Sequence, residues 1–366
     1  MSTNLAIVTW NTYYNFGTYL QAFALQQYLY QEGFDNMILD DSSYIISYKP
    51  KLKDKLKKPL LKLVKKEFRV FEKSITQSHS LFDSFKRNML HIDYFNQSLT
   101  TLDSKYDIYI CGSDQIWNPF SLEDSKTDFF YASFSQKKKI AYAPSIGVSE
   151  VPQQYKEKLR NLTFNFNFLS AREQQGVDIL HKLTGKEVVR VVDPTLLLDS
   201  KQWNVLLPKN PPCNEKYVLA YFLTPNNIYI NAVSEYAHKK GLRLKMFFIH
   251  KSYNEYNCDL ITAGPIEFLH YVKDAEYLFT DSFHGTIFAS IFHTQFFTFR
   301  RFKQTPRSQN SRVEGLFDMM GVSERLLDEE TYSKIYNLKD INFTHIKTNL
   351  DPFINKSKEY IKKALQ

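Results

Sequence analysis

The sequence has few cysteines and lacks a long apolar run, and each absence excludes a class of protein. Cys111, Cys213 and Cys258 lie far apart in no ligand-like spacing, so we expect reduced thiols in a cytoplasm and no zinc or other metal site. No segment has the roughly twenty consecutive apolar residues that span a bilayer. The first ten residues lack the basic region and long apolar core of a secretion signal, which also favours a cytoplasmic protein.

The excess of basic charge is confined to one segment. Between Lys49 and Lys73 the chain has eleven Lys or Arg and three acidic residues, which accounts for the whole net charge of +8. Pro59 can open a helix there with two unlike sides. The apolar side holds Leu60, Leu61, Val64, Phe68 and Phe71, and the basic side holds Lys62, Lys65, Lys66, Arg69 and Lys73.

This basic helix has two interpretations. It can bind an anionic membrane surface, which would make the protein peripheral on the inner membrane face, or it can cover the core as a solvated surface helix. A nucleic-acid partner is not expected, because the positive charge is confined to this segment and no recognition module is readable.

The length of 366 residues and the hydrophobic content of 43% predict two domains. Strands alternate with helices on both sides of a Pro-containing polar linker at 207–215, so we place the boundary near residue 205. This alternation predicts an α/β fold with a mostly parallel sheet in each half and a cleft between the halves. The expected strands are 5–10, 37–39, 106–111, 139–143, 168–172, 187–192, 217–223, 242–250 and 277–280.

The segment 279–289 is the strongest candidate for a reaction site. An apolar strand end at Phe279 is followed by Asp281 and Ser282, either of which can cap a helix that begins near His284. Helix starts at the carboxyl ends of parallel strands attract anions, so a titratable imidazole at this turn suits phosphate chemistry. The alternative is a capping turn whose histidine only packs.

Other predicted strand ends also collect polar residues. Such loops form ligand pockets in open α/β sheets, so several convergent groups favour a shared site. The candidates are Asn11, Asn15 and Gly17, then Ser113 and Asp114, and then Arg172. Each has a structural alternative: turn formation for the asparagines and Gly17, helix capping for Ser113 and Asp114, and an ion pair with Asp193 for Arg172.

Taken together, these segments resemble the polysaccharide pyruvyl transferase family. The matching stretches, in the order of the family, are Asn15–Ala22, Gly112–Asn118, Ser170–Glu173, Val192–Leu196, Asp281–Gly285 and Asn310–Arg312. The resemblance implies two Rossmann-like domains arranged as in GT-B glycosyltransferases. The first, 1–205, would carry a helical insertion at about 49–103 and the acceptor side; the second, 206–366, would carry His284 and the donor side, with the last helix packing back on the first domain.

The resemblance also implies the reaction and the roles of the residues. Phosphoenolpyruvate would donate its pyruvate unit to two hydroxyls of a sugar, which can be linked to a lipid diphosphate, and no cofactor would be needed. His284 would be the general acid and base. Donor-binding residues would be Arg172, Arg312, Ser282, Gly285 and Arg301, and acceptor- or phosphate-binding residues would be Asn15, Gly17, Ser113 and Asp114.

One position departs from the family pattern. Many members carry a basic residue two positions before the histidine, where this chain has Ser282. Arg300, Arg301 and Arg307 are candidates to replace that contact with the donor. Two alternatives therefore stay open: a GT-B glycosyltransferase that uses a nucleotide sugar, and a non-catalytic, membrane-associated partner of a polysaccharide assembly system.

Overall fold

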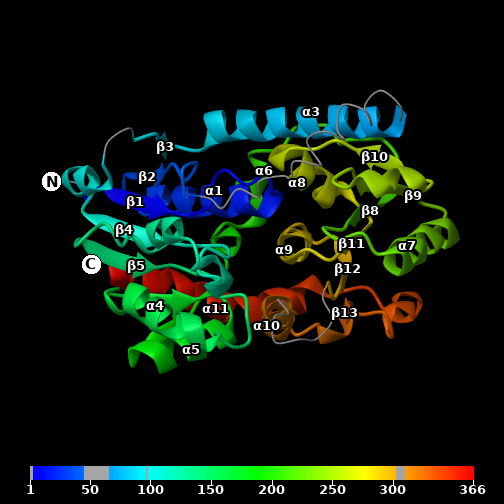
Figure 1. The fold of residues 1–366 in the computed structure, drawn as a ribbon. Coiled ribbons are helices and arrows are strands. Elements are labelled where there is room, and N and C mark those ends of the chain that lie inside the picture. The colour runs from blue at the N-terminus through cyan, green and yellow to red at the C-terminus, as the bar shows by residue number, and fades with distance from the viewer. Residues whose placement is uncertain (1–2, 45–65, 96–97, 302–309) are drawn as a thin grey trace.

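The structure is a computed structural model that describes residues 3–44, 66–95, 98–301 and 310–366. Two parallel sheets form two halves of the molecule, side by side in Figure 1. The expected α/β architecture with a parallel sheet in each half is confirmed.

The first sheet has five parallel strands in the order β3-β2-β1-β4-β5. They are β1 (Leu5–Val8), β2 (Asn36–Leu39), β3 (Ile92–Asp93), β4 (Ile108–Cys111) and β5 (Lys138–Ala141). Helix α1 (Phe16–Gln31) follows β1, and its apolar residues join one large core cluster. Beyond β5 lies a small parallel sheet of β6 (Leu169–Ala171) and β7 (Val188–Arg190), with helices α4 (Gln153–Phe164) and α5 (Gln174–Thr184).

The second sheet has six parallel strands in the order β10-β9-β8-β11-β12-β13. They are β8 (Tyr217–Tyr221), β9 (Arg243–Phe247), β10 (Asp259–Ile261), β11 (Tyr277–Thr280), β12 (Gln295–Phe299) and β13 (Leu326–Leu327). The helices of this half are α7 (Asn227–Lys240), α8 (Pro265–Asp274), α9 (Phe283–Phe292) and α10 (Asn310–Met320). In both sheets the strand order reverses beside the first strand of the half, as in dinucleotide-binding folds, and such folds bind ligands beyond the carboxyl ends of the strands at that reversal.

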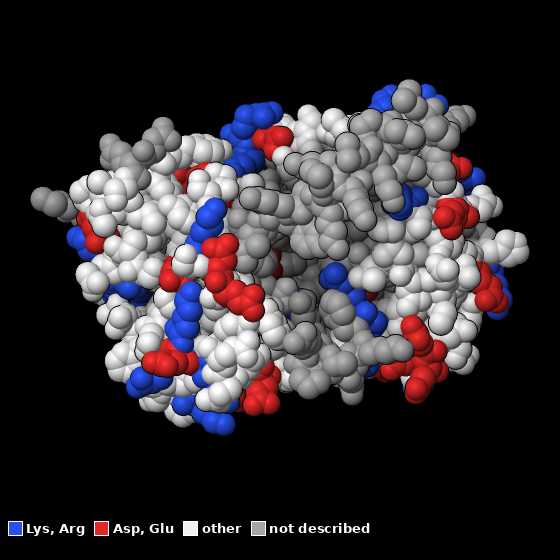
Figure 2. Space-filling model, viewed as in Figure 1, with Lys and Arg blue, Asp and Glu red and all other residues white. Residues whose placement is uncertain are grey.

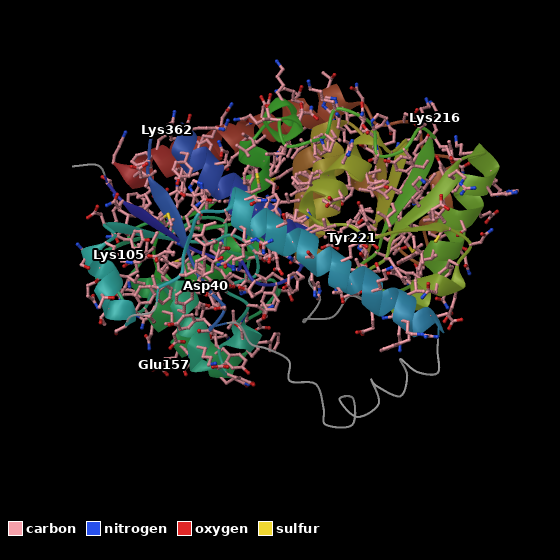
Figure 3. The ribbon with its side chains drawn as sticks, turned by 90° about the horizontal axis from the view of Figure 1, so that it is seen from above. Asp40, Lys105, Glu157, Lys216, Tyr221 and Lys362 are labelled. Carbon is pink, nitrogen blue, oxygen red and sulfur yellow. The ribbon has the colours of Figure 1, made fainter. Side chains whose placement is uncertain are left out.

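Helix α3 (Lys66–Met89) lies across both halves, as Figures 1 and 3 show. Near its start Phe71 packs edge-to-face on Phe248, with ring centroids 5.1 Å apart. Near its end Lys86 Nζ donates a hydrogen bond, at 2.8 Å, to Oδ1 of Asn11, a residue that follows β1 in the chain. The predicted helix start at Pro59 lies outside the described residues, but at Phe71 the apolar side of the helix faces the protein.

The last helix, α11 (Phe343–Leu365), returns to the first half (Figure 1). Its Ser357 Oγ accepts a hydrogen bond from Val192 N at 2.9 Å, and Tyr360 donates its hydroxyl to the carbonyl of Ala141 at 2.8 Å. Helices α3 and α11 thus each contact both halves. None of the helices in the described part of the chain is long and apolar enough to cross a membrane.

Candidate active site

A pocket of about 330 Å³ lies where the two strand-order reversals face each other. Its wall comes from the segments that follow β1, β4, β8 and β11, together with residues near β12 and α10. Figure 2 shows the face of the molecule that is hollowed between the halves. The pocket is lined by Trp10, Tyr13, Tyr14, Asn15, Thr18, Asp114, Gln115, Leu223, Asp281, Ser282, Phe283, His284, Phe299, Arg300, Arg301, Asn310, Arg312, Val313 and Leu326.

His284 occupies the first turn of α9, as the sequence predicts. Ser282 is the N-cap of this helix, and its Oγ accepts a hydrogen bond from Gly285 N at 3.2 Å. Only 7% of the surface of His284 is exposed, but the residue lines the pocket. On one side it touches α1: a Cβ added to Gly17 would lie 1.9 Å from His284 Nδ1, so only glycine allows this approach.

Asp193 holds the other side of the imidazole. His284 Nε2 lies 3.4 Å from Asp193 Oδ2, and Arg172 Nη1 donates to the same oxygen at 2.6 Å. Thr195 donates its N–H and its hydroxyl to Oδ1. Burial raises the pKa of Asp193, but His284, Arg172 and the Thr195 hydroxyl outweigh this effect and hold the pKa below its usual range. Asp193 is therefore an anion at neutral pH.

Arg172 contacts the same carboxylate as His284 but is not one of the described residues that line the pocket. Its side chain is 2% exposed and stacks on the ring of Phe283, with 4.4 Å from the guanidinium carbon to the ring centroid. Burial lowers its pKa, but Asp193, Asp114 and Glu173 raise it, and the net pKa is above the usual value. The ion pair of Arg172 with Asp193, which the sequence offered as the structural alternative, is thus present. Arg172 contacts Phe283, which lines the pocket, and Asp193, which contacts His284.

Three other arginines line the pocket on the side of the second half. Burial, followed by repulsion from Arg172, lowers the pKa of Arg312 to about 10, so it remains a cation at neutral pH. Arg301 Nε donates to Thr224 Oγ1 at 2.7 Å, and Arg300 Nη2 lies 3.1 Å from Glu314 Oε1. Arg307 lies outside the described residues.

The residues that the resemblance assigns to binding of the sugar acceptor or phosphate make mostly structural contacts. Asn15 is the N-cap of α1, and its Oδ1 accepts from Gly17 N and Thr18 N. Asp114 accepts from Thr18 Oγ1 at 2.7 Å and lines the pocket, whereas Ser113 is fully buried and donates to the carbonyl of Ala143. Of the predicted site residues, the pocket brings together Asn15, Asp114, Ser282, His284, Arg301 and Arg312, while Gly17, Ser113, Arg172 and Gly285 support it from outside.

Two features of the site are not predicted by the sequence. The sequence places Asp193 in the stretch Val192–Leu196 and as a partner of Arg172, but it does not predict the contact of Asp193 with His284. Trp10, Tyr13 and Tyr14 form part of the wall. The available signal was three aromatic residues within five positions after a strand that ends at the same edge as the polar turns. No group of three or more possible metal ligands occurs among the described residues.

Asp281 follows β11 and hydrogen-bonds to the backbone that follows β8, the neighbouring strand of the second sheet. Its carboxylate accepts hydrogen bonds from Leu223 N at 2.6 Å and Thr224 N at 3.0 Å, just after β8. Burial raises the pKa of Asp281 to about 6, against the opposing effects of these N–H groups and Arg301. This carboxyl therefore fixes the loop that also carries the hydroxyl partner of Arg301.

The raised pKa of Asp281 predicts a pH dependence of stability. The folded state, with a pKa of about 6, binds the proton more tightly than the unfolded state, with a pKa of about 3.9. The stabilising effect of protonation is complete below the unfolded pKa and is lost as the pH rises through the folded pKa. Relative to Asp281→Asn, the wild type should lose roughly 2–3 kcal/mol of unfolding free energy from about pH 4 to about pH 6. Urea denaturation at a series of pH values measures this; a pH-independent difference contradicts it.

Two facing parallel sheets with a pocket between their carboxyl ends define a GT-B fold. UDP-GlcNAc 2-epimerase from Methanocaldococcus jannaschii is similar, with a TM-score of 0.53 and 12% identity, over 94% of this chain and 95% of that one. The S. aureus MnaA structure with UDP has a TM-score of 0.52 and 13% identity, over 92% and 87% of the two chains. At such identities these likenesses show the fold alone.

The family model described as polysaccharide pyruvyl transferase matches residues 15–301, more than half of the chain. The chain therefore belongs to this family, as the six motifs indicate. The matched segment includes His284, Arg172 and Arg301, and ends before Arg312. No curated protein matches the sequence at a significant level.

Proposed function

We propose that the protein transfers the pyruvate unit of phosphoenolpyruvate onto two hydroxyls of a sugar and forms a cyclic ketal, in the biosynthesis of a bacterial cell-surface polysaccharide. The observation that carries the proposal is a single pocket in which a carboxylate-held imidazole and three guanidinium groups line the wall. Family membership supports transferase chemistry on a polysaccharide precursor.

The electrostatics of the wall suit a trianionic donor. Arg312 is partly buried at the pocket and its pKa is lowered to about 10, so it remains a cation at neutral pH that can attract a bound carboxylate or phosphate. Arg301 is only partly buried at the pocket. Its guanidinium lines the same pocket as Arg312, and it is our candidate for the basic contact that Ser282 does not provide.

The imidazole supplies the proton transfers. Protonation of the methylene carbon of phosphoenolpyruvate makes C2 electrophilic, and a sugar hydroxyl then adds to C2. The C2–O bond to phosphate breaks, and the second hydroxyl closes the ring. Of the two hydroxyl protons released, one balances the proton gained by the new methyl group and the other leaves on phosphate. His284 can donate and accept these protons because Asp193, an anion in the folded state, holds its Nε2 side.

Product analysis tests the proposal. Purified protein is incubated with phosphoenolpyruvate and a panel of methyl hexopyranosides, and phosphate release is followed together with the methyl proton signal of a ketal. We expect one phosphate for each ketal. Phosphate release without a ketal would contradict the transfer step.

The role of Arg301 gives a separate prediction. Charge-assisted hydrogen bonds contribute about 1.5–3 kcal/mol, so Arg301→Ala should raise KM for phosphoenolpyruvate roughly 10- to 100-fold with a smaller effect on kcat. The matched control is Arg160→Ala, which removes an exposed arginine of α4, and should leave both constants unchanged. Equal KM values in Arg301→Ala and wild type would remove this residue from the donor site.

The GT-B fold also suits a nucleotide-sugar transferase, because fold does not determine chemistry. Thermal shift assays with phosphoenolpyruvate and with UDP-GlcNAc separate the two, since a ligand stabilises only a protein that binds it. We expect stabilisation by phosphoenolpyruvate.

A membrane contact through Lys49–Lys73 stays part of the proposal. Residues 49–65 lie outside the described part of the chain, and at Phe71 the apolar side of α3 packs against Phe248. The basic charge of the segment, rather than burial of Phe71 in lipid, would therefore hold the protein at an anionic surface near a lipid-linked acceptor.

A further inference from the structure

Three aromatic residues line the pocket on the side of the first half. Trp10, Tyr13 and Tyr14 follow β1 and together form what we call the aromatic wall. The arginines of the pocket all come from the opposite half. One side of the cavity is thus cationic and the other is rich in aromatic surface, which suits two ligands of different chemistry.

Tyr14 is exposed yet firmly held. The relative exposure of this residue is 45%, the ring stacks on His79 of α3 with centroids 3.8 Å apart and an interplanar angle of 12°, and its hydroxyl donates to Asp83 Oδ1 at 3.1 Å. Phe82 packs against its edge. Burial lowers the pKa of His79 despite the charge of Asp83, so a neutral imidazole backs the phenol ring at neutral pH. His79 covers one face of the ring, and the exposed part of Tyr14 lies at the pocket among the described residues.

Trp10 and Tyr13 complete this surface. Their rings pack edge-to-face with centroids 5.0 Å apart, and Trp10 also packs edge-to-face on Phe130 in the core of the first half. Burial, followed by the charge of Asp41, raises the pKa of Tyr13, so its phenol stays neutral and can donate a hydrogen bond. These contacts restrict the rotamers of the wall before any ligand binds, which lowers the entropy cost of binding.

We propose that the aromatic wall is the acceptor subsite and that one hexopyranose ring stacks with its apolar C–H face on Tyr14. The inference rests on the proposed function, because it assigns the sugar acceptor to the side of the pocket opposite the arginines that would bind the donor. The C–H bonds of a pyranose ring present weakly positive hydrogens, and the face of an aromatic ring carries negative quadrupole density. Asn15, whose Oδ1 caps α1, has an Nδ2 group on the same side of the pocket that can donate to a ring hydroxyl.

The size of the pocket limits what the subsite accepts. A volume of about 330 Å³ lies at the lower end of the range for ligand sites. The cavity therefore suits a single sugar ring beside a three-carbon donor, with the remainder of the acceptor extending outward past Tyr14. Helix α3, which contributes His79 and Asp83, becomes a positioning element for acceptor recognition.

Saturation-transfer NMR with methyl glycosides of glucose, galactose and mannose, without phosphoenolpyruvate, tests the subsite, and phosphoenolpyruvate is titrated in a separate experiment. In the wild type we expect saturation concentrated on the C–H protons of one ring face for at least one glycoside. Tyr14→Ala should weaken its affinity about tenfold, whereas Tyr14→Phe, which keeps the ring and loses the bond to Asp83, should stay within about twofold. The matched control is Tyr94→Ala, which removes an exposed tyrosine that is not part of the pocket wall. Its affinity for the glycoside should equal that of the wild type.

The possible results separate the subsite from the donor chemistry. Unchanged glycoside affinity in Tyr14→Ala, or an equal loss in Tyr14→Phe, would overturn the stacking role. If no glycoside binds while phosphoenolpyruvate does, the subsite is wrong and the proposed donor stands. If glycosides bind through Tyr14 and phosphoenolpyruvate does not bind, the subsite stands and the proposed function fails.

Discussion

Replacing His284 with glutamine should lower kcat for ketal formation by a factor of about 10²–10⁴, the range expected when a general acid–base group is lost. Glutamine keeps a polar side chain of similar size beside Gly17, so the contact with α1 survives. The affinity for phosphoenolpyruvate should change little, because the guanidinium groups of the pocket remain. Steady-state kinetics and a direct titration of phosphoenolpyruvate measure the two effects separately.

The matched control is His181→Gln on α5, an exposed histidine whose change should leave kcat unaltered. A His284→Gln variant with the kcat of the wild type would show that the imidazole takes no part in proton transfer. The histidine would then only pack in the capping turn, which is the alternative that the sequence leaves open.

Asp193→Asn is the second substitution with a large expected effect. It leaves the guanidinium of Arg172 buried without the anion at 2.6 Å, while Asp114 lies 4.0 Å away, and loss of one member of a buried ion pair costs about 3–5 kcal/mol of unfolding free energy. It also removes the anion beside His284 Nε2, so kcat should fall as well. Urea denaturation and steady-state kinetics measure these losses.

A double variant distinguishes the structural role of Asp193 from its positioning role. In Asp193→Asn with Arg172→Leu no buried charge is left unpaired in this pair, so most of the lost stability should return. The activity should stay low, because the imidazole still lacks its anionic partner. Recovery of activity together with stability would show that Asp193 acts on folding alone.

The sequence predicts the turn of His284 well because the signals there are local. The strand Tyr277–Thr280 has the bounds that were expected, and Ser282 caps the following helix in the structure as proposed. The short strand β10 was missed, since it is recognised by its pairing with β9 and not by a pattern of its own. Strand β12, Gln295–Phe299, was also missed, although its sequence QFFTF is an aromatic-rich run typical of a strand.

The contacts that complete the site depend on packing between distant segments. A sequence does not show whether the guanidinium of Arg172 faces solvent, and here it is buried against Asp193 and Phe283. The stack of Tyr14 on His79 requires α3 to fold across both halves, and no local pattern fixes that path. The resemblance to the family implies the fold, the histidine and a stretch that contains Asp193, but neither the aromatic wall nor the contact between Asp193 and the imidazole.

A crystal structure of the protein soaked with phosphoenolpyruvate tests the central claim most directly. The account predicts that the donor lies in the pocket between the two sheets, with its anionic groups toward Arg301 and Arg312 and its methylene carbon about 3–3.5 Å from a ring nitrogen of His284. A donor bound elsewhere, or one whose reactive carbons point away from His284, would contradict it.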